Sequence, residues 1–130
     1  LPSLASKVKA GLNIKSPDCV AYDILFGCPG WVEGVIQATA FIKAGMAKKC
    51  LVLGADTLSR VLDHSDRDSM IYADGAGASM IEASKGKGGI LSHKTVTYTS
   101  EGEADFIFYG PSNDKGKGTK YIKMHGRKSL

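Results

Sequence analysis

The chain has 130 residues and a formal net charge of +4, and with 43% hydrophobic and 23% charged residues it has the composition of one ordinary globular domain. Its three cysteines form no CxxC pair, its three histidines lack paired ligand spacing, and no apolar run is long enough to span a membrane. A disulfide framework, a metal site and a membrane protein are therefore not expected. The lysines have no interleaved aromatic residues, which argues against nucleic-acid binding, and an odd number of unpaired thiols fits the reducing cytoplasm.

The first part of the chain predicts two helices and two strands. Residues 3–12 form an amphipathic pattern typical of a short helix with Ser3 as its cap. Residues 19–26 are nearly continuously apolar, as in a strand that is covered on both faces. Residues 29–44 predict a helix that is apolar almost all round and therefore buried in a layered fold, and residues 50–55 predict a second buried strand. A strand, a helix and a strand in this order predict a βαβ unit with a parallel sheet.

The rest of the chain carries weaker signals. Residues 60–68 are polar and charged, which indicates an exposed irregular segment or a short helix. Further strands are predicted over residues 76–83 and 89–99, and a brief one over 121–124. Asp23 is the one charged residue in the first apolar run, so it needs a buried partner or a place at an interface.

Cys28 is the candidate nucleophile because it lies at the junction of the first predicted strand and the long helix. A thiol at the start of a helix is near unpaired N–H groups and the positive end of the helix dipole, and both stabilise the thiolate. The same N–H groups can stabilise an oxyanion that develops on a thioester of that sulfur. The alternative is a small, inert core residue, and position alone leaves both open. For Cys19 and Cys50, which lie inside apolar runs, the core interpretation is preferred.

Several segments, in this order, resemble the β-ketoacyl-acyl-carrier-protein synthase III family of condensing enzymes. They are the Cys-x-Gly-aromatic motif at 28–31, the GAD strand at 54–56, the DR pair at 66–67, the DGAGA stretch at 74–78 and a Met-x-Gly-Arg segment at 124–127. The resemblance covers nearly the whole chain. It implies an α/β, thiolase-like layered fold, of which residues 1–130 are one partial half with a mixed sheet and a buried nucleophile helix.

The resemblance also implies roles for four residues. Cys28 matches the acyl-accepting nucleophile of the family, and its N–H matches one donor of the oxyanion hole. Arg67 matches an arginine that contacts the coenzyme A nucleotide. Tyr72 falls near a bulky residue that lines the acyl channel, and Trp31 replaces the usual Phe with a larger ring that can narrow the acyl pocket. No metal or cofactor is implied, since acyl-CoA is a substrate.

The implied activity is that of an acyltransferase in fatty acid biosynthesis. Cys28 would take the acyl group of a short acyl-CoA, and malonyl on the acyl carrier protein would then decarboxylate and displace it. The family forms homodimers through a strand that matches residues 20–24. The His and Asn that serve its second step have no match in this chain, so we expect an incomplete portion of a catalytic domain without condensing activity of its own.

Two alternatives remain open at this point. One is a different thiolase-fold enzyme, such as a synthase of specialised metabolites that loads from acyl-CoA. The other is a non-catalytic half-domain that dimerises and supports a partner, because half a fold exposes apolar faces.

Overall fold

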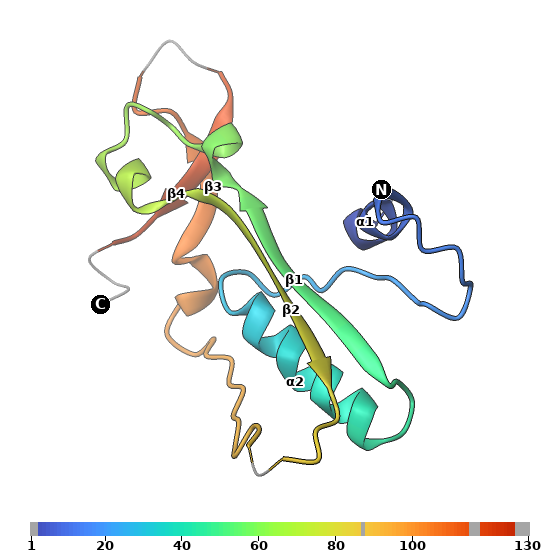
Figure 1. The fold of residues 1–130 in the computed structure, drawn as a ribbon. Coiled ribbons are helices and arrows are strands. Elements are labelled where there is room, and N and C mark those ends of the chain that lie inside the picture. The colour runs from blue at the N-terminus through green and yellow to red at the C-terminus, as the bar shows by residue number, and fades with distance from the viewer. Residues whose placement is uncertain (1–2, 87, 115–117, 127–130) are drawn as a thin grey trace.

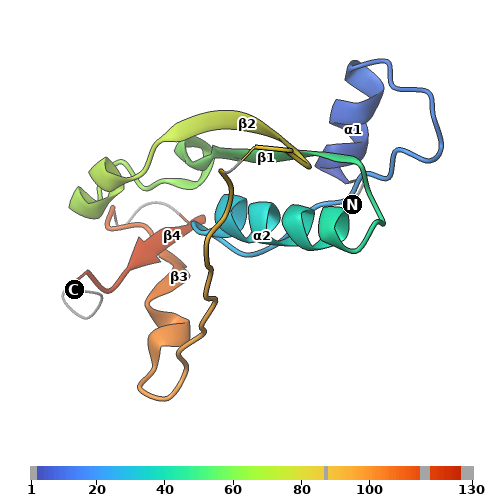
Figure 2. The same cartoon turned by 60° about the horizontal axis from the view of Figure 1, so that its bottom comes forward.

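The computed structural model of the chain describes residues 3–86, 88–114 and 118–126. These residues form two α-helices and two separate antiparallel sheets of two strands each, β1–β2 and β3–β4. The bounds are α1 Leu4–Gly11, α2 Gly30–Lys43, β1 Lys49–Thr57, β2 Asp74–Glu82, β3 Ile107–Pro111 and β4 Lys120–Met124. α2 covers one face of the β1–β2 sheet, and α1 stands off beyond the other face (Figures 1 and 2). No helix of the described residues is long and apolar enough to cross a membrane.

Asp23 ties the segment before α2 to the start of α1. Its carboxylate accepts hydrogen bonds from the backbone N–H groups of Leu4 and Ala5, both at 2.8 Å, and from the Ser3 hydroxyl at 3.1 Å. The N–H groups of Ala5 and then Leu4 hold the pKa of Asp23 below its usual value, because they stabilise the charged carboxylate. The expected partner of Asp23 therefore exists, but it is the exposed N-terminal end of a helix and not a buried group.

We expect the Asp23→Ala variant to lose protection of the amides of α1 from hydrogen exchange. Because the folded-state pKa of Asp23 is depressed, its contribution is present above the ordinary Asp value of about 3.9 and is lost as the pH falls through the folded-state pKa. Protection of α1 in the unmodified chain should thus decline on acidification below about pH 4, whereas the variant should be weakly protected at every pH. Exposed Asp18 provides the matched control, and unchanged protection of α1 in Asp23→Ala would contradict the assignment.

Small residues bring α2 close to β1. Gly34 and Ala38 are the buried residues of α2, and Val52 is buried opposite them. A Cβ placed on Gly34 would lie 2.8 Å from Cγ1 of Val52, which is closer than real Cβ contacts, so the two elements approach closely at this glycine. In the same way a Cβ on Gly54 would lie 3.2 Å from the Cβ of Trp31. These two contacts place the first turns of α2 over the middle of β1.

The helix predicted over residues 29–44 forms as α2, but it is not buried all round. Pro29 is the N-cap, and Gly45, with a φ of 72°, follows the helix in the left-handed conformation of a C-terminal glycine. Trp31 and Val32 are 42% and 52% exposed. The reason is that, within the described part of the chain, the β1–β2 sheet covers only one face of α2.

The predicted βαβ unit is wrong. Residues 20–26 form no helix and pair with no strand among the described residues, and Leu25 is fully exposed at 101%. β1 pairs instead with β2 in antiparallel register, from Lys49 opposite Glu82 to Thr57 opposite Asp74. Residues 20–26 lie outside both two-stranded sheets, and apolar side chains alone do not pair a segment into a strand.

Of the remaining predicted elements, some are confirmed and one is wrong. The strand predicted over 76–83 is present as β2, and that over 121–124 is present as β4. The strand predicted over 89–99 is wrong, because these exposed residues have no paired neighbour. β3 was not predicted, although its short apolar run is the partner that β4 requires. Residues 60–68 contribute to two short 3-10 helices, η1 (Leu58–Val61) and η2 (Arg67–Ile71).

Candidate functional site

Cys28 lies in the tight turn that leads into α2. Gly27 has a φ of 69°, and its carbonyl accepts a hydrogen bond from the N–H of Gly30 at 2.9 Å, which closes the turn around Cys28. Cys28 precedes the N-cap residue Pro29 by one position, and its side chain is exposed. Cys28 thus directly precedes a helix end at which no side chain caps the first-turn N–H groups. In this structure Cys28 is not a core residue.

The other two thiols have different surroundings. Cys19 is exposed, so its predicted place in a core strand is wrong for the same reason as the strand itself. Cys50 is half-buried on β1, and its Sγ lies 4.0 Å from the carbonyl oxygen of Ala38 on α2. Cys50 is therefore part of the helix–sheet contact, which agrees with its predicted packing role.

Tyr72 follows η2 and is electrostatically coupled to Cys28. Its ring is half-buried, and its hydroxyl is buried with no hydrogen-bond partner among the described residues. Burial raises the pKa of Tyr72 above its usual value, and negative charge at Cys28 and then at Asp68 raises it further. Tyr72 and Cys28 are two of the four residues that the sequence predicted for one site, and no hydrogen bond joins them among the described residues.

The other two predicted site residues, Trp31 and Arg67, lie on α2 and on η2. Trp31 lies in the first turn of α2 with its Cβ over Gly54 of β1. Arg67 is the exposed first residue of η2. In both views the start of α2 and the β3–β4 hairpin, which contacts η1 and η2, lie toward the same end of the β1–β2 sheet (Figures 1 and 2). Within the described residues no hydrogen bond or ion pair links Arg67 to the other three predicted residues.

A polar cluster that no sequence motif predicts holds the start of η2. Lys123 of β4 donates from Nζ to Oδ2 of Asp63 at 2.7 Å, to Oδ2 of Asp66 at 2.8 Å and to Oδ1 of Asn113 at 3.1 Å. We call these four residues the Lys123 cluster. Asp63 is 1% exposed and Lys123 is 7% exposed, so the ion pair is buried. The only sequence signal for it is a lysine between apolar neighbours in a brief strand, because its members are far apart along the chain.

The Lys123 cluster is saturated with hydrogen bonds. Asp63 also accepts bonds from the N–H of Ser65 at 3.1 Å and from the N–H of Asn113 at 2.7 Å. The bond from Lys123 lowers the pKa of Asp63 and that of Asp66 and outweighs burial, which raises both. Burial lowers the pKa of Lys123, but its bonds to the two carboxylates outweigh this and leave the pKa raised. Among the described residues, no group of three or more His, Cys, Asp or Glu side chains is arranged to hold a metal ion.

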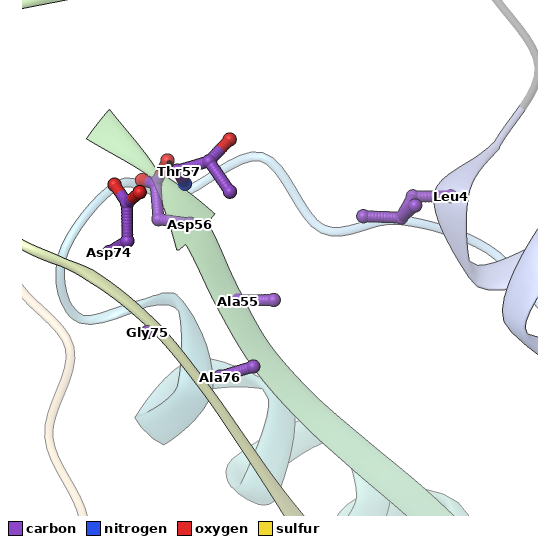
Figure 3. A pocket seen from close by; sticks show the side chains of 7 residues that line it. All are labelled: Leu4, Ala55, Asp56, Thr57, Asp74, Gly75 and Ala76. Atoms are coloured by element: carbon purple, nitrogen blue, oxygen red, sulfur yellow. Dashed lines mark hydrogen bonds between the residues drawn. The ribbon is translucent and has the colours of Figure 1, made fainter. Parts of the chain in front are cut away.

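A shallow pocket of about 350 Å³ lies on the sheet face that points away from α2 (Figure 3). Figure 3 shows Leu4 of α1 facing the ends of β1 and β2 across it. Asp74 in this pocket already accepts hydrogen bonds from the N–H of Ser59 at 2.8 Å and from its hydroxyl at 2.6 Å. None of the four predicted site residues lines the pocket, so it is separate from the region around Cys28. Its lining residues are Leu4, Ala55, Asp56, Thr57, Asp74, Gly75 and Ala76.

Comparison with known proteins decides which family this arrangement represents. The sequence model of 3-oxoacyl-[acyl-carrier-protein] synthase III matches residues 22–99, more than half of the chain. The chain belongs to the 3-oxoacyl-[acyl-carrier-protein] synthase III family. The matched range contains Cys28 with the turn into α2, and it contains η2 with Tyr72.

Curated members of the synthase III family align with almost the entire chain. The β-ketoacyl-[acyl-carrier-protein] synthase III of Erythrobacter litoralis is 35% identical over 97% of the chain and 39% of its own length. That of a Chelativorans species is 36% identical over 97% of the chain and 40% of its own length. The chain thus spans about two fifths of the length of these relatives.

Solved synthase III structures have the same fold over this part. The enzyme of Aquifex aeolicus superposes with a TM-score of 0.79 at 35% identity, over 98% of this chain and 38% of that one. The enzyme of Pseudomonas aeruginosa superposes with a TM-score of 0.81 at 27% identity, over 98% and 40%. The predicted fold class, a partial thiolase-like α/β fold, is confirmed, although the described sheets are antiparallel pairs and not one mixed sheet.

Proposed function

We propose that this chain carries the acyl-accepting half-reaction of a 3-oxoacyl-acyl-carrier-protein synthase III in fatty acid biosynthesis. The observation that carries the proposal is an exposed Cys28 beside the uncapped first turn of α2, in a chain that belongs to this family. The thiolate of Cys28 attacks the carbonyl carbon of a short acyl-CoA. The bond from that carbon to the CoA sulfur then breaks, and CoA leaves with the proton that Cys28 gave up.

The neighbouring residues have roles that fit their positions. The N–H groups at the start of α2, which follow Cys28 directly in the chain, stabilise the oxyanion of the tetrahedral intermediate. Trp31, in the first turn of α2, and Tyr72, at the end of η2, line the path of the acyl chain. Arg67 is exposed and positively charged, so it binds the phosphates of the CoA nucleotide. Acyl-CoA is a substrate here, and the proposal needs no cofactor.

The second half-reaction needs more than these residues. Malonyl on the acyl carrier protein loses CO₂, and the resulting carbanion displaces the acyl group from Cys28 as a 3-oxoacyl thioester. None of the histidines of the chain matches the family's His in context, and the chain spans about two fifths of its relatives. We therefore propose that these 130 residues load an acyl group but do not condense it. We keep the reducing cytoplasm as the proposed location.

A CoA-release assay tests this proposal. The purified chain is mixed with acetyl-CoA in the presence and absence of malonyl-acyl carrier protein, and free CoA and 3-oxoacyl product are measured. We expect a single burst of CoA, no more than one per chain, and no product. Product formation at the rate of an intact synthase III would contradict the proposed division, and the absence of any burst from a folded chain would contradict acyl loading.

We also propose a homodimer formed through residues 20–24, and this exposed segment favours the alternative of a dimerising half-domain. The segment belongs to no described helix or strand, Val20 is 78% exposed, and Leu25, which follows the segment, is 101% exposed. An unpaired extended segment with apolar side chains readily adds to a second copy. Analytical ultracentrifugation of the chain and of its Val20→Lys variant tests this interface. The unmodified chain should be a dimer and the variant a monomer, and a monomer in both would exclude the interface.

A further inference from the structure

The Lys123 cluster joins the β3–β4 hairpin to the segment that carries Arg67 and Tyr72. Lys123 comes from β4, whereas Asp63 and Asp66 precede η2. The bonds at 2.7 Å and 2.8 Å are short, charge-assisted and almost closed to solvent. A hairpin residue therefore determines where η2 begins.

The contacts continue from Lys123 through η2 to Tyr72. Asp66 is the N-cap of η2, and its Oδ1 accepts a hydrogen bond from the N–H of Asp68 at 3.0 Å while its Oδ2 accepts from Lys123. The carbonyl of Asp66 accepts from the N–H of Ser69 at 3.1 Å, and the carbonyl of Ser69 accepts from the N–H of Tyr72 at 3.2 Å. Each residue in this series is positioned by the one before it, so a shift at Asp66 moves both ends of η2.

The charges explain why Lys123 matters for Arg67 in particular. Arg67 lies between two aspartates in the sequence, yet within the described residues it forms no ion pair. Asp66 directs its carboxylate to Lys123 and to the N–H of Asp68, so it is not available to Arg67. Without the lysine, Asp66 would be an uncompensated negative charge next to the guanidinium and would compete with any anionic ligand.

We propose that Lys123 is a positioning residue for acyl-CoA binding. It neutralises Asp66 and fixes the N-cap of η2, which leaves the guanidinium of Arg67 exposed for phosphate and holds Tyr72 at the end of η2. This rests on the proposed function of Arg67 and Tyr72 and adds to it a residue that contacts neither the thiol nor the ligand.

Three variants separate positioning from general stability. Lys123→Met removes the charge, Asp66→Asn keeps the shape and the cap but weakens the bond to Lys123, and Lys123→Arg restores the charge. Lys49→Met is the matched control. It removes an exposed ion pair of 2.9 Å between Lys49 and Glu82, which join β1 and β2 at the end of the sheet far from η2. With coenzyme A as the probe, we expect the dissociation constant to rise about tenfold in Lys123→Met and about threefold in Asp66→Asn, as for a lost charge-assisted contact. It should recover in Lys123→Arg and stay unchanged in Lys49→Met.

Two further readouts show whether a variant is only unfolded. Alkylation of exposed Cys28 by iodoacetamide does not use Arg67, so its rate should stay within about twofold of that of the unmodified chain. Alkylation of half-buried Cys50 should stay slow, because it reports the α2–β1 contact. Hydrogen exchange of residues 66–72 should become faster, while that of β1 and β2 stays the same. If Cys50 becomes reactive in Lys123→Met, the α2–β1 contact is lost in that variant. The CoA affinity of the milder Asp66→Asn variant then tests the proposal.

Each outcome bears on the proposal. Unchanged CoA affinity in a variant with protected Cys50 would overturn it, and so would unchanged exchange of residues 66–72. Failure of the unmodified chain to bind CoA would count against the proposed function and against positioning for CoA together. In that case faster exchange in Asp66→Asn would show that the Lys123 cluster still holds η2, which separates the two failures.

Discussion

Replacing Gly34 with valine is expected to lower the free energy of unfolding by about 2–3 kcal/mol, the cost of inserting extra methyl groups into a close contact. A Cβ at this position would lie 2.8 Å from Cγ1 of Val52 and 3.7 Å from Cδ1 of Ile24. Val52 is buried and β-branched, so its side chain cannot easily turn away. The added side chain would therefore push α2 off the sheet and displace Cys28 with it.

Chemical denaturation of four chains measures this contact: the unmodified chain, Gly34→Val, Val52→Ala and the double variant. Space created by Val52→Ala should accommodate the new valine, so the double variant should be more stable than the sum of the single changes predicts. Gly77→Ala is the control, since a Cβ on Gly77 would meet nothing within 4 Å. Additive effects in the cycle would contradict close packing of α2 on β1 at this point.

Cys28→Ala is expected to abolish the burst of CoA release from acetyl-CoA. The thiol is the only group of the proposed site that can form the thioester, so no residual burst should remain. Because the side chain is exposed, the free energy of unfolding should change by less than about 0.5 kcal/mol.

Cys19→Ala is the matched control, because Cys19 is also exposed but lies away from the turn into α2. This control should keep the full burst. A burst that survives in Cys28→Ala, or that disappears equally in Cys19→Ala, would be incompatible with the assigned nucleophile. If Cys28→Ala changes nothing at all, including dimer formation, the non-catalytic half-domain becomes the better interpretation.

The elements that could be predicted are those whose signals are local. The helix α2 begins after Gly27-Cys28-Pro29 and ends before Gly45, and each of these boundaries follows from backbone preferences within a few residues. The position of Cys28 at this boundary is therefore readable from the sequence. The roles of Trp31, Arg67 and Tyr72 around the thiol are predicted from the resemblance to the family and not from local signals.

The elements that could not be predicted depend on distant residues. Residues 19–26 are apolar enough for a buried strand, but burial needs a covering layer, and the described residues do not provide one. Conversely, β3 is short and ends at Pro111, so its own sequence gives little reason to expect a strand until β4 pairs with it. The Lys123 cluster shows the same limit for a site, because Asp63 and Lys123 meet only after the hairpin folds back over η2.

The central claim is that Cys28, and not another thiol, accepts an acyl group from CoA. The most direct measurement is tandem mass spectrometry of a protease digest of the folded chain after incubation with acetyl-CoA. We expect one acetyl group on the peptide that contains Cys28 and none on the peptides that contain Cys19 or Cys50. Acetylation of Cys19 to the same extent, or an unmodified Cys28 in a chain whose Cys50 is still protected, would contradict it.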